Sequence, residues 1–114
     1  MPLGRSFDLL TDRDLRPSLA EAACDQTAIR DAALVVVITA VLARTSAKYR
    51  ERASRYVAIE AGHVAQNVLL QAVTLGLGAV PIGAFDDDEL RRALGADPRH
   101  DPLYLVAAGH PRQS

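Results

Sequence analysis

The longest pattern of apolar and polar positions in this chain is helical. Between residues 46 and 75 there is no proline and one glycine, and apolar or large side chains recur at steps of three and four residues. This spacing is typical of one face of an α-helix. The recurring residues are Tyr49, Ala53, Tyr56, Ile59, His63, Gln66 and Leu70. We therefore predict one helix over residues 46–75, which at 1.5 Å per residue would be roughly 45 Å long.

The second half of this predicted helix is apolar on almost every side, as expected for a helix that is enclosed on several faces. A helix of this length also exceeds the expected width of so small a domain. We therefore expect part of residues 46–75 to pack against another chain, in a homodimer or with a partner subunit.

Shorter apolar runs predict strands. Residues 33–41 (ALVVVITAV) form a continuous, β-branched run, which favours a strand buried on both faces and central in its sheet. Residues 79–82 and 102–108 (PLYLVAA) predict two further strands, and residues 7–10 are a candidate for a fourth.

Turn and capping residues predict where the remaining helices begin and end. Pro17 suits the first turn of a helix over residues 18–29, and Gly76 and Gly78 suit the end of the long helix. Asp86, with Glu89 three residues later, predicts a capped helix over residues 87–94 that Gly95 ends. Capping and the helix dipole account for the acidic run of residues 86–89, so we predict no metal site there.

Composition narrows the class of protein. A chain of 114 residues, 49% hydrophobic and 24% charged, fits one compact domain over residues 1–114. A net charge of -1 argues against a nucleic-acid partner. Because no apolar run has the length of a membrane span or the form of a signal peptide, we expect a cytoplasmic protein. The single cysteine, Cys24, is expected to be a small buried helix residue.

Two features carry candidate chemistry. Gly83 lets the backbone approach whatever lies above it, because no side chain intervenes. Lys48 and Tyr49 can present a cation and a phenol at the mouth of a pocket. From these residues alone, a solvated lysine beside a packed tyrosine is the favoured interpretation.

Four motifs in order resemble the nitroreductase superfamily of flavin enzymes, and within it the SagB-type branch, which includes the dehydrogenases of thiazole/oxazole-modified peptides. The resemblance runs from Phe7 to Arg112. The motifs are KYRERASRY at 48–56, EAGHVAQN at 60–67, GLGAVPIGAFDDDEL at 76–90 and PLYLVAAGHP at 102–111.

The resemblance implies an α+β fold with three layers (α/β/α), a mostly antiparallel sheet and one long central helix. It also implies an FMN-dependent oxidoreductase that transfers hydride between flavin N5 and a small or peptide substrate, with FMN bound at a homodimer interface. In relatives, the segment that matches Pro81, Ile82, Gly83 and Ala84 passes the flavin, with backbone near N5.

The resemblance also implies roles for basic residues. Those after the last strand hold the FMN phosphate in relatives, which makes Arg112 and His110 candidates here. In the SagB-type branch, a pair that matches Lys48 and Tyr49 takes part in catalysis, which favours a role as proton acceptor over the solvated alternative.

The chain departs from the family in length, since it matches only the C-terminal half of the family's domain. The other half normally carries an Arg-x-Ser-x-Arg phosphate clamp and a Pro-Ser segment beside the flavin. Arg5 and Ser6 do not replace the clamp. Either a partner chain supplies that half, so that this chain is one subunit of the oxidoreductase, or the alternative function applies, a non-catalytic oligomerisation or binding module that has lost flavin binding.

Overall fold

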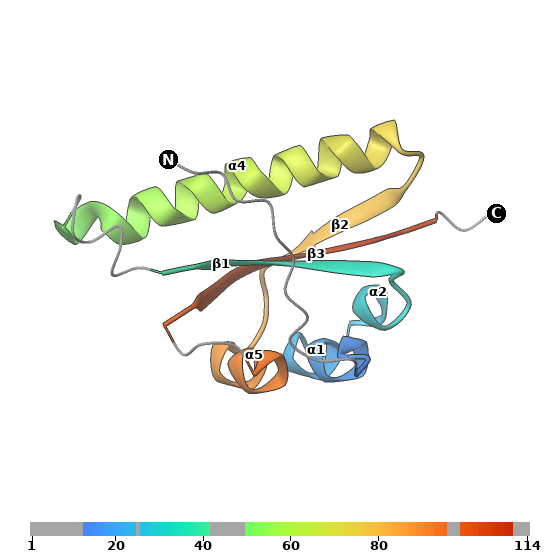
Figure 1. Cartoon of the computed structure of the whole chain (residues 1–114), viewed down its shortest axis with the longest axis horizontal. Helices are drawn as coiled ribbons and strands as arrows, with labels where there is room; N and C mark the ends of the chain where they lie inside the picture. The colour runs from blue at the N-terminus through green and yellow to red at the C-terminus, as the bar shows by residue number, and fades with distance from the viewer. Residues whose placement is uncertain (1–12, 25, 42–49, 96–98, 111–114) are drawn as a thin grey trace.

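The computed structural model describes residues 13–24, 26–41, 50–95 and 99–110. Within these residues, three strands form an antiparallel sheet in the order β1-β3-β2. Helix α4 covers one face of the sheet, and α1, α2 and α5 cover the other (Figure 1). The elements in chain order are α1 (Arg16–Ala22), α2 (Thr27–Arg30), β1 (Leu34–Ala40), the 3-10 turn η1 (Arg50–Arg52), α4 (Ala53–Thr74), β2 (Gly78–Ile82), α5 (Asp87–Leu94) and β3 (Asp101–Gly109). The predicted three-layer α+β class is thus confirmed.

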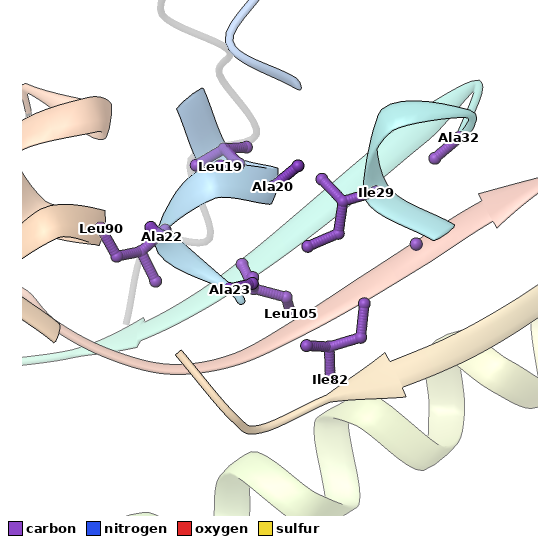
Figure 2. Packing of buried hydrophobic residues seen from close by; sticks show 10 residues of the cluster. Leu19, Ala20, Ala22, Ala23, Ile29, Ala32, Ile82, Leu90 and Leu105 are labelled. Atoms are coloured by element: carbon purple, nitrogen blue, oxygen red, sulfur yellow. The ribbon is translucent and has the colours of Figure 1, made fainter. Parts of the chain in front are cut away.

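Strand β3 is the centre of the sheet, because it pairs with β1 on one side and β2 on the other. Its residues Leu105 and Val106 are both fully buried. Since successive side chains of a strand point to opposite faces, Leu105 packs toward α1, α2 and α5, and Val106 toward α4. Figure 2 shows Leu105 and Ile82 among the buried side chains between the sheet and the layer of α1, α2 and α5.

Residues 33–41 contain a strand, β1 (Leu34–Ala40), but among the described strands it does not have the predicted central position. Within the described sheet β1 is an edge strand, and its first residue, Leu34, is 57% exposed. A continuous β-branched run indicates that both faces of a strand contact apolar groups, but it does not indicate that both edges are paired. The pairing alone places β3 in the middle.

The single helix predicted over residues 18–29 is also wrong. The structure has two short helices, α1 and α2, with a turn between them. At that turn Cys24 has φ = 58° and is exposed, so it is not the buried helix residue that we expected. The reversal allows Ala23 and Ile29 to be fully buried against the sheet, which one straight helix would not achieve.

The long helix is confirmed over Ala53–Thr74. Residues 50–52 form a 3-10 turn rather than part of the helix, and residues 46–49 lie outside the described residues, as do residues 7–10. At the other end, Gly76 takes φ = 73°, and the Leu77 amide donates to the Ala72 carbonyl at 2.8 Å. These features form a Schellman-type ending, as the glycine predicted.

Helix α4 packs on the sheet through small side chains. Its buried residues are Ala53, Val57, Ala61, Ala65 and Ala72. Alanine allows the helix and sheet backbones to approach closely, and several larger apolar residues of α4 lie outside this contact and are exposed. Ile59, Leu70 and Val73 lie on one side and are 44%, 57% and 74% exposed. These three residues form what we call the α4 stripe, an apolar surface that the described residues do not cover.

Two arginines tie the helical layer of α1, α2 and α5 to the strands. Arg16 donates to the Ala32 carbonyl at 2.6 Å and forms an ion pair with Asp14, which lowers the pKa of Asp14 to about 2. Arg91 of α5 donates to Asp101 at the start of β3 at 2.5 Å, which raises the pKa of Arg91 above its ordinary value. None of the helices in the described part of the chain has the length and apolarity needed to span a bilayer.

Candidate functional site

The candidate site begins where β2 ends. Pro81 and Ile82 are the last two residues of β2 and pair with Val106 and Leu105 of β3. Ile82 is buried in the core, whereas Pro81 is exposed on an edge strand. Proline has no N–H to donate, so an edge is the position in a sheet that it tolerates. The buried Ile82 therefore fixes where the following residues leave the sheet.

Gly83 and Ala84 follow the last pair of the ladder, and both are exposed. A Cβ added at Gly83 would meet one atom within 4 Å, Tyr104 Cε1 at 3.8 Å, which is ordinary contact. The φ of Gly83 also lies outside the left-handed region. The described fold therefore does not require glycine at residue 83, but a ligand that lies against this backbone would.

Tyr104 is a neighbour of the candidate site that the sequence analysis missed. It is half-buried in β3, one residue before Leu105, and its ring is the closest group to the missing side chain of Gly83. An antiparallel register between residues 79–82 and 102–108 would have identified it, but the sequence alone does not provide that register.

His110 lies at the other end of the β2–β3 ladder. It follows β3 directly, is exposed, and lines a shallow hollow of about 270 Å³ together with Asp31 and Gly78. Gly78 pairs with Gly109, and Ile82 pairs with Leu105. At about 3.3 Å per residue, Gly83 and His110 are roughly 20 Å apart along the strands. One ligand that contacts both must therefore be elongated.

The remaining candidates, Lys48, Tyr49 and Arg112, lie outside the described residues. The chain is described again from Arg50, which follows the Lys48–Tyr49 pair directly and opens the η1 turn before α4. Within the described ranges, no group of three or more His, Cys, Asp or Glu side chains could hold a metal ion. Asp86 instead accepts a hydrogen bond from the Glu89 amide at 2.9 Å, which confirms the predicted cap.

A second hollow, of about 380 Å³, lies between β1 and α4. Its lining includes Leu34, Val36, Val64 and Leu75, with Asn67 and Gln71 as its polar members. Since no ionisable side chain lines it, this apolar groove offers contact area rather than acid–base chemistry.

Comparison with known proteins gives concordant matches. The family described as "Nitroreductase family" matches residues 5–110. A Methanocaldococcus jannaschii protein that is named as a nitroreductase is 42% identical over 109 residues, which are 96% of this chain and 54% of the relative.

Solved structures agree with this match. A protein of Anabaena variabilis, described as a nitroreductase, superposes with a TM-score of 0.82 at 35% identity, over 88% of this chain and 20% of that one. The NADPH:FMN oxidoreductase of Vibrio harveyi superposes with a TM-score of 0.75 at 28% identity, over 91% of this chain and 49% of that one. The chain thus spans about half the length of the curated relative that it matches.

Substitution of Gly83 and Gly109 should show which of these two glycines the fold itself requires. Gly83→Ala should leave the free energy of unfolding unchanged or raise it by about 0.4–1 kcal/mol, because the added methyl fits and the unfolded chain loses freedom. Gly109→Ala should lower it by about 1–3 kcal/mol, because the new Cβ would lie 3.3 Å from the Ala33 backbone nitrogen. Urea denaturation of both variants measures these changes, and a Gly83→Ala protein less stable than Gly109→Ala would contradict the assignment.

Proposed function

Because the chain belongs to the nitroreductase family, we propose that it forms the C-terminal half of an FMN-dependent oxidoreductase of the SagB type. The observation that carries this proposal is the exposed backbone of Gly83 and Ala84, which leaves the sheet next to a buried, paired Ile82. FMN would supply an N5 atom that accepts or gives a hydride. The substrate would be a small molecule or a peptide.

The described residues fit an FMN molecule in two respects. The ring of FMN could approach the Gly83 backbone, since Gly83 has no side chain of its own and its nearest neighbour, the Tyr104 ring, lies 3.8 Å from where a Cβ would be. The amide N–H groups of Gly83 and Ala84, which lie beyond the last ladder pair, would be hydrogen-bond donors to the ring.

The phosphate end of FMN would lie toward the end of β3. FMN is elongated, with its ring at one end and its phosphate at the other, so from Gly83 it could extend along the ladder in the direction of His110. Arg112, two residues beyond His110, would donate charge-assisted hydrogen bonds to the phosphate, and His110 would support it. This assignment rests on the family resemblance and on the exposure of His110.

The Lys48–Tyr49 pair would act on the substrate proton. We assign Lys48 as the proton acceptor and Tyr49 as its neighbour in the substrate pocket, because this pair matches the catalytic pair of the SagB-type branch. Removal of a proton by Lys48 would accompany hydride transfer from the same substrate.

The α4 stripe supports a homodimer. Ile59, Leu70 and Val73 are apolar and exposed on one side of a helix of 22 residues. At 1.5 Å per residue, the stripe extends over roughly 21 Å of the helix, from Ile59 to Val73. Burial of such side chains against a second copy removes apolar area from water.

The full 114-residue protein should bind FMN. Protein purified from cells, or mixed with FMN, is expected to be yellow and to quench flavin fluorescence in a saturable titration. The Gly83→Ala variant should bind more weakly with its stability intact, because a methyl group would separate the ring from the backbone. Colourless protein that does not take up added FMN would contradict this function for the chain by itself and would favour the non-catalytic binding module.

Substitution of Lys48 should abolish turnover while FMN stays bound. Lys48→Ala is expected to slow oxidation of an azoline-containing peptide by about 10²–10⁴-fold, the usual contribution of a general base. Lys48→Arg, which keeps the charge but does not release its proton near neutral pH, should be equally slow. Unchanged turnover in either variant, at equal flavin occupancy, would refute the assigned role.

Substitution in the α4 stripe should break the dimer. The native protein is expected to have the mass of two chains by light scattering after gel filtration, and Leu70→Glu the mass of one, because a buried carboxylate is strongly unfavourable. Ser18→Glu adds the same charge at an exposed position of α1, on the other side of the sheet, and should remain dimeric. A monomeric native protein, or a dimeric Leu70→Glu, would be the opposite result.

A further inference from the structure

The segment from Gly83 to Asp86 connects two fixed elements. It begins after Ile82, which is buried and paired with Leu105, and it ends at the first turn of α5. Within it, Phe85 packs against the buried core, whereas Gly83 and Ala84 are exposed. The position of these two exposed residues therefore depends on how firmly the end of the segment is held.

Asp86 holds that end by two different hydrogen bonds. Its backbone amide donates to the carbonyl of Ala22, the last residue of α1, at 2.8 Å. Its side chain accepts from the Glu89 amide at 2.9 Å and so caps α5. One residue thus joins the segment to two separate helices, which a cap that serves only its own helix does not do.

The two helices that Asp86 joins are themselves anchored in the core. Ala22 of α1 is almost completely buried, and Leu90 of α5 is fully buried. Figure 2 shows Ala22 and Leu90 next to each other, on the face of the sheet away from α4. The Leu90 amide also donates to the Asp86 carbonyl at 3.0 Å. Movement of Asp86 would therefore disturb these contacts, so its backbone stays in one place.

We propose that Asp86 is a positioning residue for the flavin. By bonding α1 and α5 at once, it fixes the exposed backbone of Gly83 and Ala84 in the arrangement that meets the ring of FMN. This inference rests on the proposed function, in which FMN lies against that backbone. Asp86 itself does not touch the cofactor.

The physical reason is the cost of ordering a loop upon binding. Without an acceptor at residue 86, the Glu89 amide loses its partner and the extended backbone of Asp86 is free to change. The bond to Ala22 then loses its alignment, and Gly83 and Ala84 sample more conformations. Ordering them when the ligand binds lowers its affinity.

The test compares three variants of the full protein. Asp86→Ala removes the acceptor and should weaken FMN binding about fivefold, the equivalent of a lost helix cap. Asp86→Asn keeps an acceptor oxygen and should bind within about twofold of the native protein. Ala93→Gly weakens α5 by a comparable amount without a change of charge or of the cap, and should also bind within about twofold.

A second measurement does not require FMN. Amide hydrogen exchange of Gly83 and Ala84 in the free protein, followed by NMR, should be faster in Asp86→Ala than in Ala93→Gly. Should Asp86→Ala not fold, Asp86→Gly takes its place, because glycine is well tolerated at the cap but offers no acceptor.

Each result supports or overturns the proposal. If the native protein and Asp86→Ala bind FMN with equal affinity, the role of Asp86 is overturned and the proposed function stands. Equal losses in Asp86→Ala and Ala93→Gly also overturn it, because they would reflect helix stability alone. Native protein that does not bind FMN overturns the proposed function and the positioning of flavin with it, whereas the exchange measurement still decides whether Asp86 holds the segment.

Discussion

The structure depends on the burial of β3 on both of its faces. Leu105 and Val106 are adjacent in sequence and fully buried, one toward α1, α2 and α5 and the other toward α4. Because both faces of β3 are buried, helices must cover both sides of the described sheet. This burial also fixes the register of β2, because Ile82 must lie beside Leu105. The point at which Gly83 leaves the sheet follows from that register.

The way α4 packs on the sheet leaves apolar surface exposed. Since its buried stripe consists mainly of alanine, the helix lies close to the strands and contributes little of its larger apolar area to the core. Ile59, Leu70 and Val73 remain exposed on one side, and an apolar groove lies on the other, between α4 and β1. Such surfaces are characteristic of interfaces rather than of the outer face of a monomer. The proposed homodimer would account for the α4 stripe.

The candidate site is made of backbone more than of side chains. Gly83 and Ala84 offer exposed amide groups, and the nearest side chain, that of Tyr104, comes from the neighbouring strand. A site of this kind depends on the rigidity of what surrounds it, because a backbone group cannot change its position as a long side chain can. The two hydrogen bonds of Asp86 supply that rigidity at one end, and the burial of Ile82 supplies it at the other.

The sequence by itself determined the features that depend on neighbouring residues along the chain. The helical spacing of α4, the glycine that ends it and the Asp86 cap of α5 were all predicted, because each involves contacts within a few residues. The three-layer class and the family also followed from the order of the motifs. Only the tertiary structure decided that β1 lies at an edge of the described sheet, that the first helical region breaks at Cys24, and that Tyr104 lies beside Gly83. These three features depend on pairing and burial between segments far apart in sequence, and local pattern contains no information about which of several apolar runs occupies the centre.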